Sequence, residues 1–259
     1  MLGAIAGDII GSVHEFLCGK TCDFELFVPE SRFTDDSVLT IAVADSLLTG
    51  AAYIEKLREY TLAYPDRGYG GRFWQWVHSG SQAPYNSWGN GAAMRVSPVG
   101  FAFDSLDAVL HEAGRSAAVT HDHPEGIRGA QATAAAIFLA RQGESKQRIR
   151  ESIRSRFAYD LRLTVDEIRP TYTFDESCQR TVPEAITAFL DGSDYEETIR
   201  LAISLGGDAD TLACIAGGIA EAYYGGVPAP IAARAMAILD EPLRATVTRF
   251  CDRYGLSAA

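Results

Sequence analysis

Two short acidic clusters in this sequence have the residue types that bind hard metal ions. The first runs from Thr34 to Asp36 and the second from Asp208 to Thr211, and each precedes an apolar stretch with helical spacing. Threonine hydroxyls and aspartate carboxylates are hard oxygen ligands that suit Mg²⁺, Mn²⁺ or Ca²⁺. Each cluster alone is also an ordinary helix start, because such side chains cap free backbone amides. Capping needs one acid per helix, so the repeated set favours metal binding.

The charge of these clusters predicts how many metal ions they hold. Their four carboxylates and the nearby acid Glu15 would place five negative charges in a small volume. Without a counter-charge, such carboxylates repel one another and raise one another's pKa values. Two divalent cations supply four positive charges and nearly balance the five, so we expect two ions rather than one.

Two further segments have features of a nucleotide-binding site. Ser87–Arg95 contains small residues whose backbone amides can approach a diphosphate, although a tight loop has the same composition. Thr120–Glu125 places His121 and His123 before an expected helix. One of them could stack on adenine or contact phosphate, and a plain surface turn is the alternative.

Apolar residues at helical spacing recur along the chain and predict the elements that position these clusters. One helix should begin after Asp36 and stop at Gly50, and the next should end before Pro65. The other expected helices cover residues 104–118, 126–142, 145–157, 180–191, 194–205, 210–224, 228–238 and 241–254.

The remaining segments contain little regular pattern. Residues 22–28 and 171–174 are candidates for short extended pieces, and residues 66–91, rich in Gly, Trp and Asn, are expected to form ordered loops beside a ligand. The sequence contains no internal repeat and no linker. We therefore expect an all-α, multi-helix protein with a single domain over residues 1–259.

Composition limits the class of protein. The 259 residues are 47% apolar and carry a net charge of −11, so we expect a globular chain that does not bind nucleic acid in general. Five scattered cysteines indicate reduced thiols rather than a disulfide framework. The apolar N-terminal stretch lacks a basic region, and no run is long enough to cross a membrane. We expect a cytoplasmic monomer without membrane association.

In their order along the chain, the motifs resemble those of the ADP-ribosylglycohydrolase family. The resemblance covers most of the chain, and the matching residues are Gly7–Gly11 with Glu15, Phe33–Ser37, Gly68–Gly70, Gly89–Arg95, Thr120–His121 and Gly206–Thr211.

The resemblance implies a compact all-α fold and a role for each matching residue. It implies two Mg²⁺ or Mn²⁺ ions as cofactors, Glu15 beside them as an intermittent ligand or proton-transfer group, and His121 beside the adenosine part of the ligand. For catalysis we expect Asp35, or else Glu15, to accept the proton of the attacking water. The implied metal ligands are Thr34, Asp35, Asp36, Asp208, Asp210 and Thr211, and the implied contacts to diphosphate and ribose are Ser87, Gly89, Asn90 and Gly91.

The implied reaction is metal-dependent hydrolysis of the bond between ADP-ribose and a modified acceptor. The partner would be an ADP-ribosylated protein, with arginine as the first candidate acceptor, or a small ADP-ribosyl substrate. Two alternatives stay open at this point. One is a metal-dependent nucleotide phosphohydrolase, and the other is a non-catalytic member that binds ADP-ribose or has a structural role. The chain is short for the family, and an acceptor preference that depends on longer insertions is not determined by this resemblance.

Overall fold

The computed structural model describes residues 1–15 and 19–257, in which the secondary structure is helical and includes no strand. The fifteen helices are α1 (Leu2–Gly11), α2 (Asp35–Thr49), α3 (Tyr53–Ala63), α4 (Gly71–Ser79), α5 (Gly91–Met94), α6 (Ser97–Ala102), α7 (Leu106–Ala118), α8 (Pro124–Arg141), α9 (Lys146–Phe157), α10 (Val165–Ile168), α11 (Cys178–Asp191), α12 (Tyr195–Ser204), α13 (Ala209–Tyr224), α14 (Ala229–Ile238) and α15 (Glu241–Tyr254). The expected all-α fold is confirmed.

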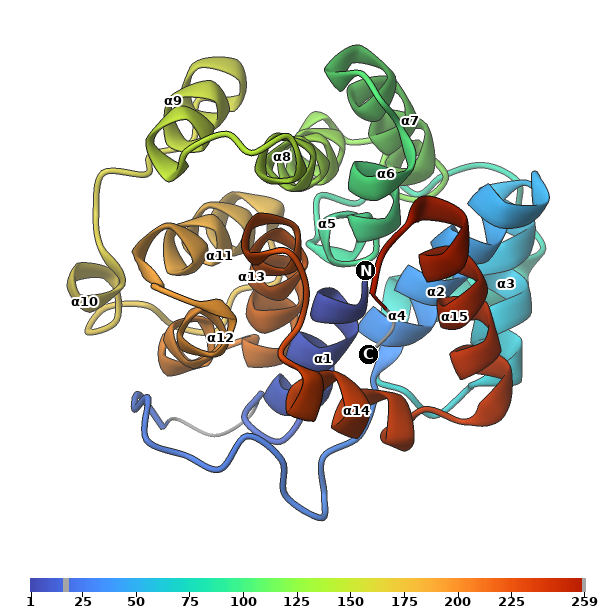
Figure 1. The fold of residues 1–259 in the computed structure, drawn as a ribbon. Helices are drawn as coiled ribbons and strands as arrows, with labels where there is room; N and C mark the ends of the chain where they lie inside the picture. Colours follow the sequence, from blue (N-terminus) through green and yellow to red (C-terminus); the bar gives the residue numbers. More distant parts are fainter. Residues whose placement is uncertain (16–18, 258–259) are drawn as a thin grey trace.

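The two helices at the centre of the molecule, α1 and α13, touch along their backbones (Figure 1). Three glycines, one per turn of α1, form the contact face. A Cβ atom on Gly3 would lie 2.4 Å from the carbonyl oxygen of Gly217, and one on Gly11 would lie 2.4 Å from Cα of Asp210. Only glycine permits so close an approach, and the approach brings the start of α13 to the end of α1.

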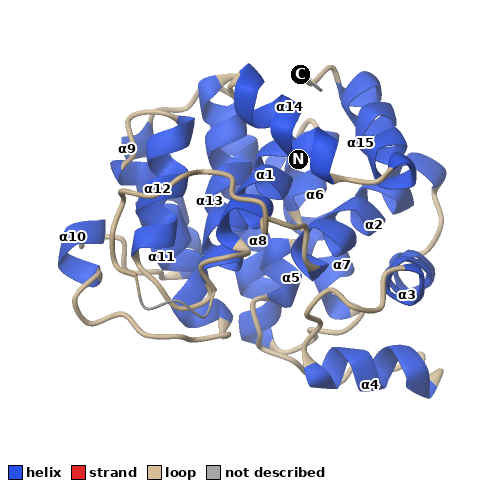
Figure 2. Cartoon of the chain, turned by 90° about the horizontal axis from the view of Figure 1, so that it is seen from below, coloured by secondary structure: helices blue, strands red, loops and turns tan. Residues whose placement is uncertain are grey.

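Other helices enclose this central pair. Helix α13 also packs against α8, α11 and α12. Helix α2 lies on the other side of α1 from α13, where it packs against α3 and α15 (Figures 1 and 2). Every residue of α1 is buried, which is why its sequence is apolar on all sides.

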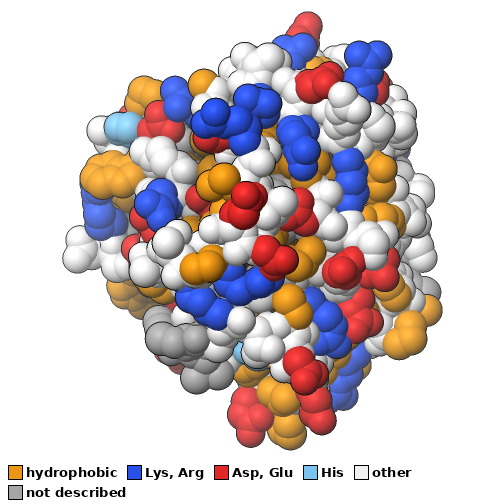
Figure 3. All heavy atoms as spheres, turned by 90° about the vertical axis from the view of Figure 1, so that its left-hand side faces the viewer, with side chains coloured by type: hydrophobic (Ala, Val, Ile, Leu, Met, Phe, Trp, Pro, Cys, Tyr) orange, Lys and Arg blue, Asp and Glu red, His pale blue; other side chains and the backbone are white. Residues whose placement is uncertain are grey.

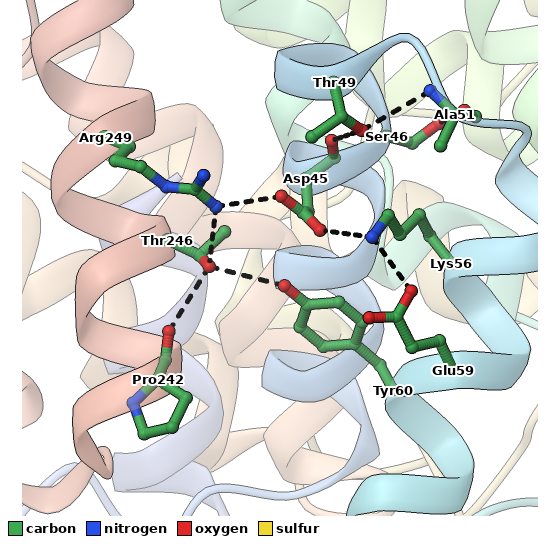
Figure 4. A network of polar contacts seen from close by, with 10 residues as sticks. All are labelled: Asp45, Ser46, Thr49, Ala51, Lys56, Glu59, Tyr60, Pro242, Thr246 and Arg249. Atoms are coloured by element: carbon green, nitrogen blue, oxygen red, sulfur yellow. Dashed lines mark hydrogen bonds and ion pairs between the residues drawn. The ribbon is translucent and has the colours of Figure 1, made fainter.

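A polar network joins α2 to α3 and α15 (Figure 4). The buried carboxylate of Asp45 lies 2.9 Å from Nζ of Lys56 on α3 and 2.9 Å from Nη2 of Arg249 on α15. The Tyr60 hydroxyl lies 3.3 Å from Oγ1 of Thr246 beside this pair. These contacts hold α2 in place against α3 and α15 and thereby fix the position of its N-terminus.

The helices expected from residue 35 to 63 and from residue 104 onward are confirmed, with ends that differ by about two residues or fewer. The extended pieces expected at 22–28 and 171–174 are wrong, because both segments are loops outside any strand. The expected loop at 66–91 is wrong in its middle, where α4 forms. Phe73, Trp76 and Val77, at helical spacing, are the buried face of α4.

On the face that Figure 3 shows, acidic and basic side chains are interspersed over the surface. Among the described residues, no helix is both long and apolar enough to span a membrane. The described cysteines, Cys22, Cys178, Cys214 and Cys251, are free thiols. Cys18 lies outside the described residues.

Candidate functional site

The N-terminal ends of α2 and α13 face a cavity of about 350 Å³. All twelve residues that the sequence analysis assigned to catalysis, metal binding or substrate binding line this one cavity. They come from five separate stretches of the chain. The fold therefore brings the predicted site residues together, while their individual roles stay predictions.

Asp8 on α1 accepts the hydrogen bonds that hold the first acidic cluster in place. Its Oδ1 accepts a hydrogen bond from the Thr34 hydroxyl at 2.6 Å. Its Oδ2 accepts from the backbone N–H of Thr34 at 3.0 Å, from that of Ser37 at 3.1 Å, and from the Ser37 hydroxyl. Asp8 is fully buried, so these bonds replace its hydration. The carboxylate thus fixes the turn that presents Asp35 and Asp36.

The capping interpretation of this cluster is correct for Thr34 and does not extend to the two acids. The Thr34 side chain accepts a hydrogen bond from the backbone N–H of Asp36 at 3.3 Å, as an N-cap does. The backbone N–H of Asp35 instead donates to the carbonyl oxygen of Arg67 at 2.8 Å. The Asp35 and Asp36 carboxylates are therefore left to face the cavity.

The second acidic cluster makes no side-chain cap at the start of α13. Gly206 and Gly207 adopt positive φ angles of 74° and 73°, a turn that glycine tolerates without strain, and Asp208 follows as the first residue outside α13. The Asp208 side chain makes no capping bond. Across the cavity, the Thr211 hydroxyl donates to Oδ1 of Asp36 at 3.3 Å, which links the two clusters directly.

The arrangement of the acidic oxygens fits a cation. One carboxylate oxygen from each of Glu15, Asp208 and Asp210 lies within 4.8 Å of the other two. The second oxygen of Asp36, Oδ2, is buried without a hydrogen-bond partner. Buried polar atoms are normally paired, so an unpaired carboxylate oxygen in a cavity that also holds these three carboxylates fits a cation.

Burial and mutual repulsion shift the titration of these acids. Burial, followed by the charges of neighbouring carboxylates, raises the pKa of Asp35, Asp36 and Asp210 well above the usual range. Glu15 is half-buried, and desolvation with the charge of Asp208 raises its pKa to about 7. The folded protein thus keeps excess protons here unless a cation neutralises the cluster.

The glycine-rich loop before α5 forms the opposite wall. Asn90 is buried, and its side-chain amide donates to Oδ2 of Asp208 at 2.6 Å and to Oγ1 of Thr181 at 3.1 Å. The hydroxyl of Ser87 accepts from the backbone N–H of Gly89 at 3.1 Å. Asn90 therefore positions an acidic residue as well as lining the cavity.

The two histidines before α8 have different surroundings. His123 is the N-cap of α8, since its Nδ1 accepts a hydrogen bond from the backbone N–H of Glu125 at 3.1 Å. His121 is buried against the glycine-rich loop, where a Cβ atom on Gly91 would lie 3.2 Å from its Nε2. Burial, then the positive charge of Arg95, holds the pKa of His121 well below its usual value.

Sequence reasoning missed several residues of the site. Asp8 belonged to a motif but received no role, although one acid in a wholly apolar helix is a usable signal. Arg95, which is fully buried and lines the cavity, was likewise given no role. Tyr85 and Phe174 also line the cavity, and no sequence pattern distinguishes them from other loop aromatics.

Comparisons with known proteins found relatives that match most of the chain. The family model described as ADP-ribosylglycohydrolase matches residues 1–257. ADP-ribosylhydrolase ARH3 of Homo sapiens is 29% identical, over 87% of this chain and 84% of that protein. ADP-ribosylarginine hydrolase Tri1 of Pseudomonas putida is 26% identical, over 87% and 69%. A solved structure named ADP-ribosylglycohydrolase-related protein complex superposes with a TM-score of 0.74 at 27% identity, covering 99% of this chain and 97% of that chain.

Proposed function

Because the chain belongs to the ADP-ribosylglycohydrolase family, we propose that it hydrolyses the bond between ADP-ribose and a modified acceptor with the help of two divalent cations. The observation that carries this proposal is the cavity itself. Two acidic clusters far apart in sequence line it together with a glycine-rich loop and a buried histidine. Carboxylates that can hold cations and a loop that can accept an anion suit a ligand with both a ribose and a diphosphate.

The residues present fit a cation centre. The donor set is oxygen only, the Oδ2 atom of Asp36 lacks a hydrogen-bond partner, and the carboxylates of Glu15, Asp208 and Asp210 converge in the same cavity. Mg²⁺ and Mn²⁺ both prefer such ligands. We assign the ions to Thr34, Asp35, Asp36, Asp208, Asp210 and Thr211. Bound there, they would neutralise the carboxylates and supply Lewis-acid polarisation of oxygen atoms.

The chain's own acids supply the proton transfers. Asp35 is the least buried aspartate of the two clusters, so its carboxylate can meet a water that enters from the cavity. We assign Asp35 as the group that accepts the proton from the attacking water, with Glu15 as the alternative. A carboxyl group with a pKa of about 7, as Glu15 has without metal, can both take up and release a proton near neutrality.

The substrate end would bind the diphosphate and the adenosine part. Ser87, Gly89 and Gly91 offer a hydroxyl and a backbone without side chains, which lets phosphate oxygens approach closely. Asn90 and His121 complete this wall. These contacts orient the ligand so that the scissile bond lies at the acidic end.

We propose arginine as the acceptor, and the relative Tri1, an ADP-ribosylarginine hydrolase by name, supports this choice. The test is product analysis on ADP-ribosyl-arginine and ADP-ribosyl-serine in parallel. Free ADP-ribose from the arginine substrate supports the proposal. Release from the serine substrate alone would mean that the acceptor is serine rather than arginine. AMP as the product would mean phosphohydrolysis, and tight ADP-ribose binding without turnover on either substrate would mean a binding role.

The cellular setting is also a proposal. The free thiols of the described cysteines support a reducing compartment, which is why we propose a cytoplasmic protein. We further propose that it acts as a monomer, and a light-scattering mass that matches one chain in solution would support this.

A further inference from the structure

A buried arginine lies directly behind His121, and its charge has no acidic partner among the described residues. Arg95 is 0% exposed. Its Nη2 donates to the carbonyl oxygen of Ser116 at 3.0 Å and to the hydroxyl of Thr120 at 2.9 Å. Its Nε and Nη1 have no hydrogen-bond partner. A buried, partly unsatisfied guanidinium is costly, and such a group needs a reason in the function of the site.

The hydrogen bonds of Thr120 determine which ring nitrogen of His121 carries the hydrogen. Oγ1 of Thr120 lies 2.7 Å from Nδ1 of His121. A guanidinium can only donate, so Oγ1 accepts from Arg95 and retains one hydrogen of its own. Among the described residues, Nδ1 is the one acceptor within hydrogen-bond distance of this hydroxyl, and donation to it leaves Nδ1 unprotonated. The hydrogen of a neutral His121 is therefore on Nε2.

The Nε2 atom faces the wall assigned to the diphosphate. A Cβ atom on Gly91 would lie 3.2 Å from Nε2 and one on Gly89 would lie 3.7 Å away. Gly126 packs closely against the base of the side chain, since a Cβ atom there would lie 2.8 Å from Cβ and 3.0 Å from the carbonyl oxygen of His121. Burial, this packing and the contact of Nδ1 with Thr120 together restrict the position of the ring.

We propose that Arg95 acts through Thr120 as a positioning residue, holding His121 as the neutral tautomer whose Nε2–H donates to an anionic oxygen of the ligand. Arg95 and Arg72 are the cations that act on the histidine, and both oppose a second positive charge on its ring. The same uncompensated charge of Arg95 makes this end of the cavity favourable for an anion. The identity of the ligand oxygen rests on the proposed function, whereas the tautomer does not.

The test starts with ¹⁵N-histidine NMR of the ligand-free protein at neutral pH. The protein has five histidines, and the signals of His121 are those that disappear in His121→Gln. We expect a proton-bearing Nε2 and an unprotonated Nδ1. A hydrogen on Nδ1, or a doubly protonated ring, would overturn the proposal without any variant of Thr120 being needed.

The second arm compares Thr120→Val with Thr120→Ser, which keeps the hydroxyl. With Val, we expect mixed tautomers and an ADP-ribose affinity weakened about tenfold by calorimetry, the effect of one lost hydrogen bond. With Ser, both should return to the wild-type values. Unchanged tautomer and affinity in Thr120→Val would contradict the relay. If the wild type shows the predicted tautomer but binds no ADP-ribose, the proposed function fails while the Arg95–Thr120–His121 assignment stands.

Discussion

Gly7 and Ala213 lie so close that a Cβ atom on Gly7 would be 2.1 Å from the carbonyl oxygen of Ala213. This contact joins the middle of α1 to the first turns of α13. The residue after Gly7 is Asp8, which holds the turn at Thr34, and Asp210 lies one turn before Ala213 on α13. The packing of one glycine therefore sets the spacing between the two acidic clusters.

Gly7→Ala should force α1 away from α13 and destabilise the protein by roughly 1–3 kcal/mol, the usual effect of overpacking. Urea denaturation at constant pH measures the change. The matched control is Gly19→Ala, because a Cβ atom at Gly19 meets nothing within 4 Å. Equal stability of the two variants would mean that α1 and α13 are not in backbone contact.

Asp8→Asn should weaken Mn²⁺ binding by about 10–100-fold, the range seen when a group that orients metal ligands is changed. An amide offers one acceptor oxygen where Asp8 uses two, so the turn that carries Asp35 and Asp36 loses its support. Isothermal titration calorimetry measures the affinity.

Asp45→Asn is the control for this effect. Asp45 is also a buried aspartate of an organised network, but its partners are Lys56 and Arg249 on the far side of α2. The change should lower stability and leave Mn²⁺ affinity unaltered. A loss of Mn²⁺ affinity as large as that of Asp8→Asn would show that general destabilisation accounts for both.

Much of this arrangement was predictable from the sequence, for physical reasons that differ between residues. Helices such as α12 and α15 have buried residues at strict helical spacing and clear caps, so their limits follow from the pattern. The two acidic clusters repeat one donor set at two helix starts, which made their meeting predictable. Helix α1 was not predicted because it is buried on every side and has no polar face to show a period.

The least predictable residues act through tertiary contacts. Arg95 has an ordinary sequence context, and its importance arises only when α7 and the following turn bring Ser116 and Thr120 to its guanidinium. Asn90 was predicted to bind substrate, and its hydrogen bond to Asp208 depends on a contact between segments 118 residues apart.

The metal-free protein should lose stability as pH rises from about 5 to about 8. Burial and neighbouring carboxylates raise the folded-state pKa of the clustered acids, and that of Glu15 reaches about 7. A raised pKa means that the folded state binds more protons than the unfolded state. The resulting stabilisation is complete below the unfolded pKa and is lost as pH rises through the folded value.

Thermal melts across this pH range, with EDTA and with Mn²⁺, measure the effect. Cations bind the deprotonated carboxylates, so the Mn²⁺-dependent rise in melting temperature should grow with pH. A metal-free melting temperature that increases between about pH 5 and about pH 8 is the result that this electrostatic account does not allow.

The most direct measurement is the release of ADP-ribose from ADP-ribosyl-arginine by the wild-type protein with Mg²⁺ or Mn²⁺, repeated with EDTA and with Asp210→Ala. We predict release that EDTA abolishes and that Asp210→Ala lacks, while circular dichroism of the variant still shows a folded helical protein. Release that persists in EDTA, or in the folded Asp210→Ala protein, would contradict a metal-dependent hydrolase built on the two acidic clusters.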